Sequence, residues 1–233
     1  MATLPEIKNA PGRSGGYVSM YDEGVRQLEH LSEYADITPE DEIYFKVAAD
    51  CTKFVHTSGA CIYTASIITT KGTDIGVIGA VLGGDAWEDM FLTAKPFFDQ
   101  LIKLANDPKI CTSVGTFAVK VIVGGDMCNL LEMFGLAKAS SNHPCYYCIL
   151  PKSQFAKVPY HPELLDQCNY GPLARTRSRI IEETRNSNRR FSVKNYPLCP
   201  LPLNPQEPLI ETVLFDELHL IPRFVGKHLF GII

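Results

Sequence analysis

The chain has 233 residues, of which 45% are hydrophobic and 21% are charged. This is the composition of a globular protein, and the length suits one large domain or one domain with an insertion. No run of about 18 apolar residues occurs, so the sequence predicts no transmembrane helix and no membrane partner. The start, MATLPEIKNAPGRSGG, has no apolar signal region, so we expect an intracellular protein, nuclear or cytoplasmic. The eight cysteines are therefore expected to be reduced thiols, with some available to a metal.

The formal net charge of −4 argues against a dedicated nucleic-acid binder, which is usually basic. The positive charge is local, however. Six arginines fall within RTRSRIIEETRNSNRR and could contact phosphates: Arg175, Arg177, Arg179, Arg185, Arg189 and Arg190. The alternative is a solvated, charged loop. No aromatic residue interleaves with these arginines, so stacking on single-stranded bases is not indicated there.

The first half of the chain predicts alternating strands and helices. Residues 1–17 look like a flexible leader, and residues 19–35 predict an amphipathic helix with Ser19 as its cap. Three glycine-bounded apolar stretches then predict an antiparallel meander, at 42–50, 60–70 and 74–84. A helix at 87–106, which Pro96 could kink or divide, a strand at 116–126 and a short helix at 127–137 follow.

From Asn142 onward the sequence is rich in proline and predicts an irregular region. One arginine-rich segment within it could be helical. The last stretch, ETVLFDELHLIPRFVGKHLFGII, is apolar and is predicted to be helical, with a break at Pro222.

The predicted order of strand, strand, strand, helix, strand and helix is that of a ribonuclease H-like mixed sheet, in which the first and fourth strands are neighbours. Asp50 and Asp126 end these two strands. Phosphoryl transfer with two metal ions needs such converging carboxylates, which suit Mg²⁺ or Mn²⁺. The alternative for Asp126 is an ordinary helix N-cap. Asp74 and Asp85 also flank strand ends, so the pair is not unique on this ground.

The sequence HPCYYC places Cys145 and Cys148 at the spacing of a zinc knuckle. A structural zinc site needs four ligands, so the pair supplies half of one. The candidates for the remainder are His143, His161, Cys168, Cys199, His219 and His228. The alternative is two unligated thiols in a loop.

These features, in their order, carry a resemblance to a known family. The segments are GGDMCNLLEMFGL, CYYC, LARTRSRIIEETR, PLCPLPLNPQEP and IETVLFDELHLIPRFVGKHLFGII. The series resembles a large group of transposon-derived proteins with a ribonuclease H-like core. It is similar, more remotely, to the catalytic subunit of the V(D)J recombinase and to Transib transposases. The resemblance covers roughly residues 42–233.

The resemblance implies a DDE-type transposase, which cleaves DNA and transfers strands with Mg²⁺ or Mn²⁺. Asp50 would be its first catalytic carboxylate and Asp126 its second. Cys145 and Cys148 would be zinc ligands, with His219 of the DELH segment as a third.

The chain also departs from this family. The family's third carboxylate lies beyond the position where this chain ends, and Cys51 stands where the family often has glycine. We therefore expect a transposase-derived protein truncated before its third acid, inactive alone, with an oligomer or longer partner chain covering an incomplete core. The alternative is a non-catalytic remnant that binds zinc and nucleic acid, or a domesticated interaction protein. The expected divisions are a leader and helix at 1–40, a partial core at 41–140, and a loop-rich, zinc-binding insertion at 141–233.

Overall fold

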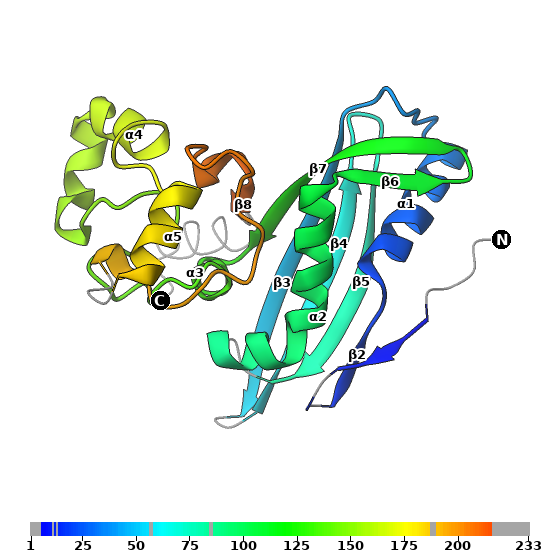
Figure 1. The fold of residues 1–233 in the computed structure, drawn as a ribbon, viewed down its shortest axis with the longest axis horizontal. Helices are drawn as coiled ribbons and strands as arrows, with labels where there is room; N and C mark the ends of the chain where they lie inside the picture. Colours follow the sequence, from blue (N-terminus) through cyan, green and yellow to red (C-terminus); the bar gives the residue numbers. More distant parts are fainter. Residues whose placement is uncertain are drawn as a thin grey trace, which may run out of the picture.

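The computed structural model describes residues 6–10, 12, 14–55, 58–83, 86–186 and 190–215. A twisted sheet with two helices forms one part, and short helices and loops form a smaller lobe toward which β7 runs (Figure 1). Among the described residues, no helix is long and apolar enough to cross a membrane.

The strands form one mixed, open sheet in the order β1-β2-β5-β4-β3-β7-β6, and β8 also pairs with β7. Their bounds are β1 Lys8–Asn9, β2 Gly15–Tyr17, β3 Ile43–Val55, β4 Ser58–Ile68, β5 Thr73–Leu82, β6 Lys109–Thr112, β7 Gly115–Gly125 and β8 Val213–Phe215. The run from β3 to β5 is the predicted antiparallel meander. β7 is parallel to both β3 and β8, so an antiparallel sheet carries a parallel portion beside β3.

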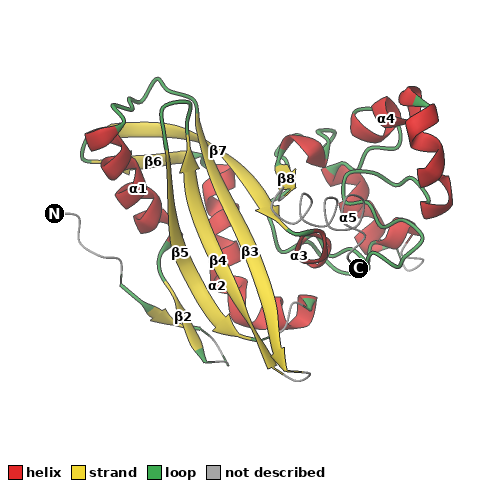
Figure 2. Ribbon diagram, turned by 180° about the vertical axis from the view of Figure 1, so that it is seen from behind, coloured by secondary structure: helices red, strands yellow, loops and turns green. Residues whose placement is uncertain are grey.

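One face of the sheet is covered by helices α1 (Met20–Tyr34) and α2 (Trp87–Asn106). Alternate residues of β3 are buried beneath them, because successive side chains of a strand point to opposite faces. Phe45 of β3 contacts α1, and Tyr63 of β4 packs against Phe97 and Phe98 of α2. Figure 2 shows the opposite face of the sheet, with α2 behind the strands.

The predicted helix at 19–35 is α1, and Ser19 caps it by accepting a hydrogen bond from Asp22 N. This helix is not part of a separate leader, since Leu28 and Leu31 are fully buried against the sheet. The predicted helix at 87–106 is also present with those bounds, and Pro96 lies inside it without dividing it.

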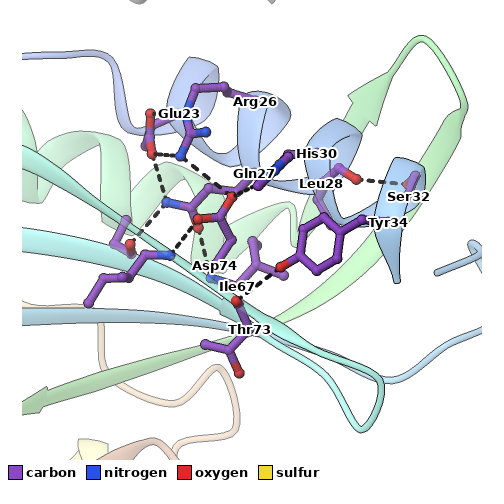
Figure 3. Close-up of polar contacts among 12 residues, drawn as sticks. Glu23, Arg26, Gln27, Leu28, His30, Ser32, Tyr34, Ile67, Thr73 and Asp74 are labelled. Atoms are coloured by element: carbon purple, nitrogen blue, oxygen red, sulfur yellow. Dashed lines mark hydrogen bonds and ion pairs between the residues drawn. The ribbon is translucent and has the colours of Figure 1, made fainter. Parts of the chain in front are cut away.

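Polar side chains attach α1 to the sheet (Figure 3). Gln27 is fully buried, and its amide both donates to Ala65 O at 3.0 Å and accepts from Ile67 N at 2.8 Å. These backbone groups belong to β4, close to an irregularity in its pairing with β5. Gln27 therefore supplies the hydrogen bonds that two buried backbone groups of a strand require.

An ionic cluster surrounds this contact. Glu23 accepts from Gln27 and from the guanidinium of Arg26, whose pKa is raised mainly by that bond. Asp74 of β5 lies 3.6 Å from Arg26 and accepts a 2.8 Å contact from His30 (Figure 3). Gly76 has no side chain at the point where Glu23 approaches β5. Asp74, one of the strand-end acids, is thus engaged in packing α1.

Four strands differ from the sequence prediction. The leader contributes β1 and β2, which extend the sheet beside β5. β6 forms a hairpin with the start of β7. The terminal stretch was expected to be helical, but residues 213–215 form β8 because they pair with β7. Residues 216–233 lie outside the described part of the chain.

The smaller lobe follows β7 and consists of short helices joined by loops. Helix α3 (Met127–Met133) begins it, and α4 (Pro162–Asn169) and α5 (Arg177–Arg185) follow. Three 3-10 segments complete it: Lys152–Tyr160, Arg190–Ser192 and Leu209–Glu211. The many prolines agree with this irregular architecture. Of the arginine-rich segment that could be helical, Arg177–Arg185 form helix α5.

Replacing Gln27 by leucine should lower the free energy of unfolding by about 1–3 kcal/mol, because Ala65 O and Ile67 N would lose their partner inside the core. Glu33→Leu is the matched control, since it introduces the same side chain at an exposed position of the same helix. Urea unfolding followed by circular dichroism measures both. Equal stabilities of the two variants would contradict this role of Gln27.

Candidate functional site

The two candidate carboxylates stand on neighbouring parallel strands. Ala48 and Ala49 of β3 pair with Gly124 and Gly125 of β7, and the residues that come next are Asp50 and Asp126. Neighbouring strands lie about 4.8 Å apart, so the two aspartates leave the backbone close together at one edge of the sheet. The prediction that their strands lie side by side is confirmed.

Asp126 is also the N-cap of α3. Its Oδ1 accepts a hydrogen bond from Asn129 N at 2.7 Å, and Asn129 Nδ2 donates to Ala49 O at 3.0 Å. The start of α3 is therefore attached to the strand beside Asp50. An ionised carboxylate has two oxygens with several acceptor positions, so one oxygen can cap the helix while the other binds a cation. Capping and metal binding are compatible for this residue.

The two glycines before Asp126 have structural causes. Gly125 has a φ of +146°, a conformation that other residues rarely adopt, and it turns the chain from β7 into α3. Gly124 has no side chain where the stem of Lys46 crosses it from β3. Asp50 is exposed and Asp126 is partly exposed, so both are open to solvent and to a cation.

A disulfide lies directly beside Asp50. Cys51 of β3 and Cys61 of β4 are paired across the antiparallel ladder and are bonded, with a Cα–Cα distance of 4.0 Å. The expectation of reduced thiols is thus wrong for this pair, because strand register brings the two residues opposite each other. Cys111 and Cys128 are exposed.

Three thiols gather in the smaller lobe. The side chains of Cys145 and Cys148 are hydrogen-bonded to each other, and Cys148 is also hydrogen-bonded to Cys168. The bond from Cys145 lowers the pKa of Cys148, while the same bond raises the pKa of Cys145. They form a satellite cluster with three apolar side chains, Leu150, Val158 and Leu173.

The backbone around this cluster is held by Arg175, which is fully buried. Its guanidinium donates to Cys145 O at 2.8 Å, to His143 O at 3.1 Å and to Phe191 O at 2.7 Å. The backbone N–H of Arg175 donates to Tyr147 O at 2.7 Å. Burial lowers the pKa of Arg175 to about 10. Its guanidinium therefore faces protein carbonyls and is withdrawn from any phosphate at the surface.

The remaining arginines differ in their surroundings. Arg177 and Arg179 are partly exposed and donate to carbonyls of Leu203 and Ala174, respectively. Arg185 and Arg190 are exposed. Arg189 lies outside the described residues. Fewer arginines are therefore exposed for contact with phosphates than the six that the sequence predicts.

The other candidate zinc ligands are placed as follows. His143 has its pKa lowered by burial, and its ring meets Phe191 edge to face. His161 pairs with Glu163, and Cys199 is buried in the main core. His219 and His228, like the strand-end Asp85, lie outside the described residues.

In the described part of the chain, no group of three or more His, Cys, Asp or Glu side chains is arranged, as it stands, to hold a metal ion. The two aspartates and the three thiols are thus separate donor sets. No known protein-family model matches the chain, and no curated protein matches its sequence.

Two substitutions of Asp126 separate the effect of losing the α3 cap on the free energy of unfolding from the effect of losing the charge. Asp126→Ala should lower the free energy of unfolding by about 1 kcal/mol, because Asn129 N loses its acceptor. Asp126→Asn should change it by less than half as much, since asparagine caps helices about as well. Thermal and urea unfolding of both variants measures this difference. Equal losses would argue that the cap contributes nothing.

Proposed function

We propose that this chain carries the core of a metal-dependent DNA-cleaving and strand-transferring protein of the ribonuclease H-like, transposase-derived class. The parallel pairing of β3 with β7 supports this most strongly, since it puts Asp50 and Asp126 at matching positions on adjacent strands. A meander followed by a helix and a parallel strand is also the arrangement that the sequence resemblance implies.

The donors at this edge suit a hard divalent cation. Mg²⁺ and Mn²⁺ favour carboxylate oxygens and retain several waters, so two aspartates open to solvent fit such an ion. When bound, the ion supplies activation of the attacking oxygen and stabilisation of the leaving one. Asp50 and Asp126 would hold it, and the hydrogen bond from Asn129 would fix the orientation of Asp126.

Manganese-dependent nicking of supercoiled DNA tests this function, and nicking by this chain would overturn the expectation that it is inactive alone. Asp50→Asn and Asp126→Asn should each reduce the rate at least about 100-fold, because each removes a charged metal ligand. Asparagine preserves the cap at position 126, so a folded protein is expected in that case.

Asp99→Asn is the control for nicking, since Asp99 is exposed on α2 and pairs only with Lys95 among the described residues. It should keep the wild-type rate. Nicking that survives Asp126→Asn would exclude this residue from the active site.

A second candidate function is zinc and nucleic-acid binding without catalysis. It is favoured by the exposed Arg185 and Arg190 of the smaller lobe, which also contains the thiol cluster. Neither arginine takes part in a salt bridge among those found in the described residues. Both are therefore available to phosphates, whereas Arg175 is not.

Replacing Arg185 and Arg190 together by glutamine should weaken DNA binding and reduce the slope of log K against log salt by about 2, because two fewer counterions are released. Lys103→Gln with Lys109→Gln is the matched control, since it removes the same charge from the far end of α2 and from β6. Fluorescence anisotropy across a salt series measures both. Equal slopes for the two double variants would contradict a phosphate contact at α5.

A further inference from the structure

We propose that Lys46 binds a phosphate of the DNA strand beside the Asp50–Asp126 pair and so positions that strand for cleavage. The inference rests on the proposed function and names a contact with its substrate. Lys46 and Asp50 belong to the same strand, β3, and are four positions apart.

Lys46 and Asp50 lie on the same face of the sheet. The residues of β3 that alternate with them, Phe45, Val47 and Ala49, are buried beneath the helices. Successive side chains of a strand point to opposite faces, so Lys46 and Asp50 share the face that is turned away from α1 and α2 (Figure 2). A ligand that binds at Asp50 therefore approaches from the side of Lys46.

The side chain of Lys46 extends toward the aspartates. A Cβ atom placed on Gly124 would lie 2.5 Å from Cε of Lys46 and 3.5 Å from its Nζ, so the end of the lysine side chain lies over this glycine. The backbone of Lys46 pairs with Ile122, two positions earlier on β7. The stem thus runs along the strands from Ile122 to Gly124, and Asp126 follows two positions further on.

The ammonium of Lys46 is only partly exposed, and it has no partner. Within the part of the chain that the structure describes, it forms neither a salt bridge nor a hydrogen bond. It shares a face with two carboxylates but is not close enough to either for an ion pair. The cation and the carboxylates are therefore separated by a gap, and both sides of this gap remain able to bind.

The gap suits a phosphate group. Residues two positions apart on a strand are separated by roughly 6.6 Å, which is the step from Gly124 to Asp126. An ammonium binds a phosphate oxygen at about 2.8 Å, and Mg²⁺ binds another at about 2.1 Å. One phosphate can therefore join the ammonium of Lys46 to a cation at the aspartates. Such a contact positions the DNA backbone and carries no sequence information.

Lys120 of β7 extends the positive charge away from the aspartates. It pairs with Tyr44, two positions before Lys46 on the same face, and its Nζ lies 5.8 Å from the centre of the Tyr44 ring. The two lysines and the two aspartates thus follow one another along β3 and β7. A DNA strand that runs along this line meets the cations before it reaches the carboxylates.

DNA binding across a salt series tests the contact without cleavage. The full chain is mixed with a fluorescein-labelled DNA duplex, with Ca²⁺ in place of Mn²⁺, and anisotropy is followed. Lys46→Met keeps an unbranched stem over Gly124 and removes the charge. It should weaken binding about tenfold, as the loss of a charge-assisted hydrogen bond requires. It should also reduce the slope of log K against log salt by about 1, because one fewer counterion is released.

A slope equal to that of the wild type would overturn the inference, as would a wild type that binds no DNA. Lys103→Met is the matched control, because Lys103 is exposed on α2, on the other side of the sheet, and this variant should keep the wild-type slope. Lys46→Arg keeps the charge and should keep the slope as well. A slope reduced equally in Lys46→Arg and Lys46→Met would attribute the loss to packing and refute a phosphate contact.

Binding of Mn²⁺ without DNA excludes an indirect effect through the metal. Lys46→Met should bind Mn²⁺ at least as tightly as the wild type, because a neighbouring positive charge opposes a cation. Electron paramagnetic resonance of the free ion measures this. Weaker Mn²⁺ binding by Lys46→Met would make Lys46 a support of the aspartates and contradict the inference.

Nicking of supercoiled DNA separates this inference from the proposed function. If the wild type nicks DNA and Lys46→Met does so at the same rate with DNA below saturation, the function stands and the role of Lys46 is wrong. If the wild type does not nick DNA but Lys46→Met shows the reduced salt slope, the phosphate contact stands and the cleavage chemistry is wrong.

Discussion

The parallel pairing of β3 with β7 is the constraint on which the candidate site depends. It places Ala49 opposite Gly125 and thereby brings two aspartates that are 76 positions apart in the sequence to one edge of the sheet. The same pairing places the carbonyl of Ala49 within reach of the Asn129 side chain. That hydrogen bond fixes the start of α3, whose N-cap is Asp126, beside β3. A shift of one residue in this register would send one side chain to the opposite face and separate the pair.

Arg175 has a comparable role in the smaller lobe, where regular structure is sparse. A single buried guanidinium joins three carbonyls of two segments that are distant in the sequence, and the backbone N–H of Arg175 is hydrogen-bonded to the CYYC loop. Burying a charge is costly unless it is compensated, and hydrogen bonds from a planar, five-donor group offset that cost efficiently. The two parts of the molecule thus use different means: strand register orders the aspartates, and a buried cation orders the thiols.

The sequence predicted the elements that have strong periodicity, and it missed those that depend on distant contacts. The helix at 87–106 was found with its bounds because apolar residues repeat at helical spacing over five turns. β8 was read as helix, since three apolar residues become a strand only through pairing with β7. The disulfide and the burial of Arg175 follow from strand register and from carbonyls far along the chain, and neither leaves a local signal. The strands that end at Asp50 and Asp126 are neighbours as the sequence predicts, whereas the closeness of Cys168 to Cys148 needed the tertiary structure.

β7 also dictates an order of assembly. The β3–β5 meander can form from contacts that are local in the sequence. The pairing of Val123 in β7 with Val213 in β8, by contrast, joins residues that are about 90 positions apart. Pairings between such distant segments form slowly, because closing the long intervening loop costs conformational entropy before any contact is made. On a ribosome, the edge of the sheet beside Asp126 would stay uncovered until the whole proline-rich lobe had emerged. Synthesis of the lobe therefore sets the time at which this end of the sheet is complete.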